Sequence, residues 1–173
     1  DRASRPKDID AFVKDAYGLP YVPGSSIKGM LRTILLVWEI CKNPDAFRQI
    51  CQEIKTSSQN KASRKSCLAR ETEKLEQQIL YTLSRDEKKV KNAVNDCLSG
   101  LHVGDSAPVS LEQLTLSQKI DYTLDGKPKP LPLLRETLIP GTEICFDLSI
   151  DTQLCSYDMD NILEAAQVFQ QVC

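Results

Sequence analysis

The stretch Tyr21-Val-Pro-Gly-Ser-Ser-Ile-Lys-Gly-Met-Leu-Arg32 gathers the residue types that bind phosphate groups. Pro23-Gly24 predicts a sharp turn, and a serine directly after it is a suitable N-cap for a helix. The N-terminus of a helix offers unpaired N–H donors and about half a positive charge, both of which attract phosphate. Two cations four residues apart share one helix face, and a glycine between them leaves room for a close approach. The predicted phosphate-binding residues are Gly24, Ser25, Ser26, Lys28, Gly29 and Arg32.

This stretch could also be read as a Walker A loop or as a helix start that binds no ligand. The spacing from Gly24 to Gly29 fits the first part of a Walker A loop, but Met30-Leu31 stands where that loop requires Lys-Ser or Lys-Thr. Nucleotide hydrolysis is therefore not expected. The same residues also fit a well-capped helix start that binds no ligand, and the sequence leaves this alternative open beside phosphate binding.

Two further side chains could take part in acid–base chemistry. His102 is the only histidine, and a lone histidine on a predicted strand is more often exposed or packed than catalytic. Asp105 follows a glycine and is typical of a turn, although it could also hold a proton or a metal ion. The basic run Arg85–Lys91 is expected to be a solvated helix face, and Lys61, Arg64 and Lys65 a basic loop. No spacing indicates a catalytic pair or triad, and no cofactor or metal is predicted.

The elements that position these residues alternate between helices and antiparallel strands. A helix is predicted from Ser25 or Ser26 to about Lys42, because apolar residues recur on one face, and strict alternation predicts a strand at 143–151. Further helices are predicted at 45–56, Leu68–Leu83, Val90–Val94 and Met159–Phe169, and a short helix or turn at Ile9–Val13. Further strands are predicted at 100–104, 114–124 and 133–138. Loops are predicted at Thr56–Ser63 and Lys127–Pro130. This order predicts an α+β fold. The predicted core residues are Ile27, Leu31, Ile34, Leu35, Trp38, Ile144, Phe146, Leu148 and Ile150.

Composition and charge limit the classes of protein to which the chain can belong. The 173 residues are 41% hydrophobic and 27% charged, with no apolar run long enough to cross a membrane, so no membrane partner is expected. Residues 1–75 carry 14 basic and 9 acidic side chains, and residues 76–173 carry 8 and 15. A basic half and an acidic half suit a subunit that contacts both a polyanion and a protein, although uneven scatter over a solvated surface explains them equally simply.

The cysteines indicate the cellular compartment of the protein, and the first residue indicates whether the chain is a whole protein. Seven cysteines, odd in number and without a CxxC pair, predict free thiols packed as small apolar side chains in a cytoplasmic protein. A chain that opens on Asp1, with no starting methionine, is expected to be part of a longer protein.

The run Pro-Gly-Ser-Ser-Ile-Lys-Gly-Met-Leu-Arg resembles the Pro-Gly-Ser-Ser-Leu-Lys-Gly-x-x-Arg signature of the RAMP superfamily of CRISPR proteins. Three later or flanking stretches fit as well: Phe12–Val22, Gly104-Asp-Ser106, and Arg135–Thr142 leading into the alternating strand. Within the superfamily this set is most similar to the fifth Csm-type subunit of type III-A effector complexes. The resemblance covers residues 9–151, and the helical segment 44–96 carries no motif.

The resemblance implies a ferredoxin-like (RRM-related) RAMP fold with a helical insertion. The core would comprise residues 1–43 and 97–173, and the insertion residues 44–96. It further implies a non-catalytic subunit at the 3′ end of the guide RNA (crRNA), involved in crRNA maturation and antiviral defence. Its partners would be crRNA, the repeated RAMP backbone subunit and the small helical subunit. The RNA-contacting candidates are the six residues of the phosphate-binding stretch.

Two alternatives to this function stay open from the residues alone. The chain could be a RAMP endoribonuclease, or a repeated backbone subunit that cleaves RNA, with Asp105 or His102 in acid–base roles. It could also be an assembly subunit whose helix start binds no RNA. Charge reversal at Lys28 would leave RNA retention unchanged in that case.

Overall fold

The computed structural model describes residues 8–59, 68–89, 91–123 and 125–172. It contains helices and two small sheets, which confirms the predicted α+β class. The α-helices are α1 (Gly24–Lys42), α2 (Arg48–Gln59), α3 (Ala69–Leu80) and α4 (Met159–Val172). The strands are β1 (Asp8–Asp10), β2 (Leu101–Ser106), β3 (Leu114–Tyr122), β4 (Pro128–Leu138) and β5 (Phe146–Ile150). Short 3₁₀ turns occupy Ala93–Asn95, Cys97–Gly100 and Leu111–Gln113.

The chain divides into two compact units, and it passes between them within α1, β2 and β5. The first unit contains the described residues up to Ser25 together with Gly104–Asp147. The second unit contains the described residues of Ser26–Val103 and of the segment that begins at Leu148.

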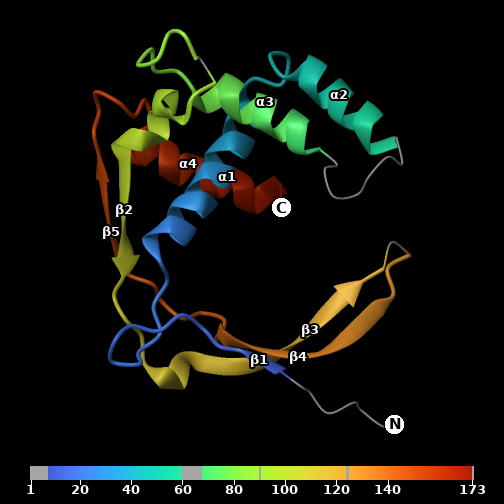
Figure 1. Cartoon of the computed structure of the whole chain (residues 1–173), viewed down its shortest axis with the longest axis vertical. Helices are drawn as coiled ribbons and strands as arrows, with labels where there is room; N and C mark the ends of the chain where they lie inside the picture. Colours follow the sequence, from blue (N-terminus) through green and yellow to red (C-terminus); the bar gives the residue numbers. More distant parts are fainter. Residues whose placement is uncertain (1–7, 60–67, 90, 124, 173) are drawn as a thin grey trace. The chain divides into compact units, whose positions relative to one another are not determined.

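The first unit is built on a three-stranded sheet with the order β1-β4-β3 (Figure 1). β3 and β4 form an antiparallel hairpin, and Gly126 supplies the positive φ of 77° that its turn requires. β1 pairs in parallel with β4, from Asp8 opposite Leu133 to Asp10 opposite Arg135. The prediction of a short helix or turn at Ile9–Val13 is therefore wrong, because the chain here adds a strand to β4.

The predicted loop at Lys127–Pro130 is also wrong, since β4 begins at Pro128. Proline lacks an N–H donor and is excluded from strands that are paired on both sides. Among the described residues, β1 pairs with β4 at Leu133–Arg135, and Pro128 and Pro130 have one described neighbour strand, β3. The two prolines thus lie where no described strand requires their missing N–H on the other side of β4.

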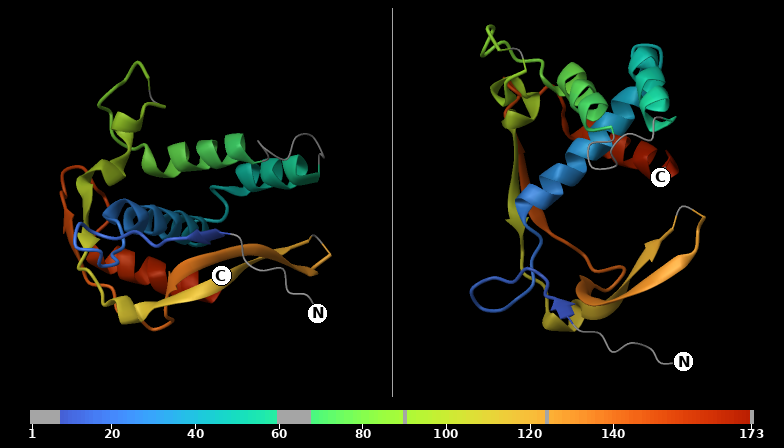
Figure 2. Two further views of the ribbon diagram at one scale, coloured as in Figure 1. Left: turned by 60° about the horizontal axis from the view of Figure 1, so that its bottom comes forward. Right: turned by 45° about the vertical axis from the view of Figure 1, so that its right-hand side comes forward.

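The second unit holds the apolar core, and α1 is its central contributor. Five predicted core residues of α1 are buried, namely Ile27, Leu31, Ile34, Leu35 and Trp38. The Trp38 ring meets Tyr157 edge-on at 6.2 Å between ring centroids, and α4 adds Ile162 and Ala165. α2 and α3 lie side by side in both views of Figure 2.

The strand that gave the clearest alternation contributes less to the core than predicted. β5 is shorter than the predicted strand 143–151 and pairs only with β2, in a two-stranded sheet. Ile144, Leu148 and Ile150 are half-buried, and Phe146 is 37% exposed. So small a sheet has few neighbours that could cover its apolar face. These four residues are therefore not fully buried core residues.

Several helical predictions need correction in the second unit. The loop expected at Thr56–Ser63 belongs to α2 as far as Gln59, and its remainder lies outside the described residues. The helix expected at Val90–Val94 is a 3₁₀ turn at Ala93–Asn95, and Val90 lies outside the described residues. Residues 85–89 form a loop and not the solvated helix face expected there.

The cysteines follow the core-thiol prediction only in part. Cys97 and Cys155 are buried, and burial raises the pKa of both thiols above the ordinary value. Cys41 and Cys145 are exposed, and Cys51 is half-buried. Cys41 continues the buried face of α1 three residues after Trp38, but it lies in the last turn of the helix. Cys67 and Cys173 lie outside the described residues.

Candidate functional site

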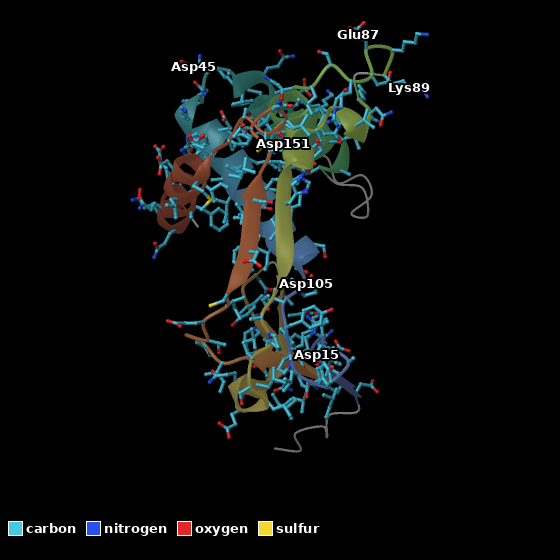
Figure 3. All side chains as sticks on the ribbon, turned by 90° about the vertical axis from the view of Figure 1, so that its left-hand side faces the viewer. Asp15, Asp45, Glu87, Lys89, Asp105 and Asp151 are labelled. Carbon is cyan, nitrogen blue, oxygen red and sulfur yellow. The ribbon has the colours of Figure 1, made fainter. Side chains whose placement is uncertain are left out.

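The turn that leads into α1 is fixed by two residues at the end of β2, within the first unit. The Gly24 N–H donates to Asp105 Oδ1 at 2.7 Å, and Gly24 is buried. The Val22 N–H donates to Ser106 Oγ at 2.8 Å, and the Ser106 N–H returns a bond to the Val22 carbonyl at 2.9 Å. Figure 3 labels Asp105 at the end of β2. The predicted motif Gly104-Asp-Ser106 therefore holds the start of the helix.

The predicted serine N-cap is wrong. Because α1 begins at Gly24, Ser25 and Ser26 lie inside its first turn, and the carboxylate of Asp105 takes the place of a capping side chain for the first amide. Ser25 and Ser26 are both exposed. The first turn of α1 contains no acidic residue of its own.

The described surface around Gly29 is open. Gly29 is exposed, and no described atom outside its own helix backbone lies within 4 Å of the position that a Cβ would take. A ligand or a longer side chain could therefore approach the helix at Gly29 without a clash. Ser26 and Gly29 together leave a polar, uncovered stretch on the first part of α1 within the second unit.

Lys28 is anchored by one of its three ammonium donors. Its Nζ donates to the Leu101 carbonyl at 2.7 Å, and the side chain is half-buried. An ammonium group has three N–H donors. The bond to Leu101 fixes the position of the charge and leaves donors for an anion.

Arg32 is held by two carboxylates. Its Nη1 lies 2.6 Å from Asp96 Oδ2, and its Nε and Nη2 lie 3.1 and 3.0 Å from Glu76 Oε2. Burial by itself would lower the pKa of the guanidinium, but the hydrogen bonds and charges of Asp96 and Glu76 raise it above the ordinary value. The structure thus brings Arg32 together with Glu76 of α3 and Asp96.

Glu76 and Asp96 were not identified as functional residues from the sequence. Asp96 carries a local signal, because its side chain caps the turn Cys97–Gly100 by accepting the Leu98 N–H at 2.9 Å. That signal predicts a turn and not a partner for Arg32. Glu76 lies 44 residues from Arg32, and no spacing rule connects two residues so far apart.

The two side chains considered for acid–base chemistry, His102 and Asp105, do not form a joint site with other catalytic groups in the described structure. His102 is exposed on β2. Asp105 borders a surface hollow of ≈ 390 Å³ in the first unit, whose other lining residues are Ser106, Ala107, Cys145, Phe146 and Asp147. Within the described parts of the chain, no group of three or more His, Cys, Asp or Glu side chains could hold a metal ion. None of the described helices has both the length and the apolar character to span a bilayer.

Comparison with known proteins identifies the family. Residues 3–158 match the model of the RAMP superfamily, and the chain belongs to that superfamily. Among its relatives, the chain is similar to the CRISPR system protein Csm5 of Mycobacterium tuberculosis, with 35% identity over 145 residues. It is also similar to Csm5 of Streptococcus thermophilus, with 31% identity over 163 residues. These matches confirm the resemblance that the signature indicated.

The matches cover most of this chain and less than half of the relatives. They include 84% and 94% of the chain but only 36% and 40% of the two Csm5 proteins. The crystal structure of T. onnurineus Csm5 has a similar fold, with a TM-score of 0.57 and 24% identity over 94% of this chain and 48% of that one.

Proposed function

We propose that this chain is part of the crRNA-binding subunit of a type III-A CRISPR (Csm) interference complex in the cytoplasm. The subunit binds the 3′ end of crRNA and takes part in crRNA maturation and antiviral defence. Its partners are crRNA, the repeated RAMP backbone subunit and the small helical subunit. The observation that carries this proposal is the 31–35% identity to proteins named Csm5 over nearly the whole chain.

The finer architecture is part of the same proposal. We infer a ferredoxin-like RAMP core from residues 1–43 and 97–173, with residues 44–96 as a helical insertion. The α2–α3 pair supports the insertion, since both helices fall within 44–96. The antiparallel β3–β4 pairing supports the core.

RNA contact is proposed at the start of α1. Ser25, Ser26 and Gly29 are exposed, and Lys28 keeps donors for a phosphate. Gly24 and Arg32 belong to the same predicted set, but each already has a carboxylate partner. A phosphate reaches the Gly24 N–H only by displacing Asp105, whereas Arg32 uses three of its five N–H donors and keeps two for RNA. About three phosphate contacts on single-stranded RNA correspond to a log–log salt slope near −2, at ~0.7 per contact.

We propose a non-catalytic subunit in preference to an endoribonuclease. A general base must be free to accept a proton from the attacking group. The Asp105 carboxylate already accepts the Gly24 N–H, and His102 is exposed on β2. Uncleaved crRNA in the presence of the wild-type protein is the expected result.

The test compares Ser26→Glu with Ser26→Gln in the full-length protein, within the assembled complex. A glutamate in the first turn stabilises a helix by about 0.3–1 kcal/mol, yet it repels phosphate. The glutamate variant should therefore retain less crRNA, or crRNA with altered 3′ ends, while its melting temperature does not fall. Ser26→Gln has the same side-chain length without the charge and should behave as the wild type. Equal crRNA content and length in both variants would refute RNA binding at the helix start.

A further inference from the structure

A loop of the second unit presents four cations that the helix start does not include. The basic loop is defined here by Arg85, Lys88, Lys89 and Lys91, all of which are exposed. Figure 3 shows the part labelled at Glu87 and Lys89 standing away from the helices of its unit. None of the four cations forms an ion pair with any residue that the structure describes. Their charge is therefore available to a partner.

Hydrogen bonds to Asn92 and Asn95 hold the described residues 86–89 of this loop. Asn95 is 1% exposed; its Oδ1 accepts the Asp86 N–H at 2.9 Å, and its Nδ2 donates to the carbonyls of Asp86 and Lys89 at 3.1 and 3.3 Å. Asp86 in turn accepts the Lys89 N–H at 3.0 Å and the Asn92 side-chain amide at 3.1 Å. A loop braced in this way loses little conformational entropy when it binds.

The lysines of the basic loop surround a hollow. Lys88, Lys89, Lys91 and Asn92 line a space of ≈ 430 Å³. Two acidic residues lie in the same segment, but the Asp86 carboxylate is used inside the loop, which leaves Glu87 as the opposing charge. Three exposed lysine side chains, none of them paired with a described carboxylate, therefore border the hollow.

We propose that the basic loop binds the phosphodiester backbone of single-stranded RNA, at a second site apart in sequence from the start of α1. Lysine is depleted from the cores of protein–protein interfaces, so a hollow lined by three lysines favours a polyanion over a protein. Lysine binds phosphate as a point charge and reads no base sequence, which suits a subunit that must accept any guide. The inference rests on the proposed function and adds a contact site to it.

The test measures the affinity of the full-length protein for a single-stranded RNA oligonucleotide across a salt series. Replacing Lys88, Lys89 and Lys91 by glutamine removes three phosphate contacts, so the log–log salt slope should become shallower by about 2, at ~0.7 per contact. The three side chains are exposed and the loop is held by Asp86 and Asn95, so the melting temperature should not change. A control with glutamine at Lys119, Lys127 and Lys129 removes the same charge from the β3–β4 hairpin and its turn and should keep the wild-type slope.

Each other outcome overturns the proposal in a recognisable way. An unchanged slope in the loop variant refutes the second site, even where Ser26→Glu still weakens binding and so supports the helix start. An equal change in the loop variant and the control shows a general effect of net charge. A loop variant that binds RNA normally but no longer joins the complex shows an acidic protein partner. A wild-type protein that binds no RNA refutes the proposed function together with this inference.

Discussion

The carboxylate of Asp105 accepts the backbone N–H of Gly24 at 2.7 Å, across 81 residues of sequence. The Pro-Gly turn and the Gly-Asp-Ser motif are thereby held together by one hydrogen bond. An anion already occupies the first amide of α1, so we expect a phosphate at the helix start to bind at the exposed Ser25 and Ser26 unless it displaces Asp105.

Removing the Asp105 carboxylate should destabilise the helix start. Asp105→Ala leaves the buried Gly24 amide without its acceptor and should lower the free energy of unfolding by about 1 kcal/mol, as other lost caps do. Asp105→Asn keeps an acceptor oxygen and should cost less. Urea denaturation measures both, with Asp147→Ala as a control, because Asp147 makes no side-chain hydrogen bond in the described structure. Equal stability of Asp105→Ala and the wild type would contradict a structural role for Asp105.

Substitution of Arg32 should lower the free energy of unfolding more than the partial exposure of its side chain suggests. Its guanidinium bridges Glu76 and Asp96, and lysine cannot contact two carboxylates in that forked geometry. Arg32→Lys should lower the free energy of unfolding by about 1 kcal/mol and Arg32→Ala by about 2 kcal/mol, given partly screened, charge-assisted bonds. Thermal denaturation measures this loss. An RNA-binding defect in Arg32→Lys with unaltered stability would show instead that Arg32 acts on RNA.

Substitution by alanine should destabilise the fold at Gly100 and stabilise it at Gly29. A Cβ at Gly100 would stand 2.7 Å from Leu154 Cβ, 2.8 Å from the Cys155 nitrogen and 2.9 Å from the Asp151 carbonyl oxygen. Gly100→Ala should therefore cost about 1–3 kcal/mol or prevent folding. Gly29→Ala meets no atom and should stabilise α1 by up to about 1 kcal/mol. Melting temperatures that fall for both variants would mean that Gly29 is not open as described.

Stability of the first unit should depend on pH through Glu136. The Lys14 ammonium, 2.6 Å away, and the Phe12 N–H, 2.9 Å away, hold the pKa of Glu136 below its ordinary value. A lowered pKa means that the fold favours the ionised carboxylate. The contribution is complete well above pH 4.5, the ordinary value, and is lost as pH falls through it toward the lower folded pKa.

Denaturation midpoints measured from pH 7 to pH 3 check this dependence. Glu136→Gln should be less stable than the wild type at pH 7, and the difference should shrink toward pH 3. Glu143→Gln replaces an exposed glutamate of the same unit and should follow the wild type at every pH. A constant difference between Glu136→Gln and the wild type would rule out the ionised pair as its cause.

Elements with local sequence signals could be predicted without the structure. α1 follows from its apolar face and ends at Lys42 as predicted, and α4 begins at Met159. β2 and β3 also lie where their patterns indicated, and the α+β class follows from the order of these elements. The RAMP signature was sufficient for the family, because it is a contiguous run of residue types.

Features that depend on residues far apart in the sequence became visible in the folded chain. Asp8–Asp10 is too short and polar to be predicted as a strand, and it becomes one because β4 offers a parallel edge more than 120 residues away. Likewise, Arg32 is paired by Glu76 and Asp96, and Gly24 by Asp105, across 44, 64 and 81 residues. A spacing rule works within a helix or a strand, where geometry repeats; partners brought together by folding follow no such period.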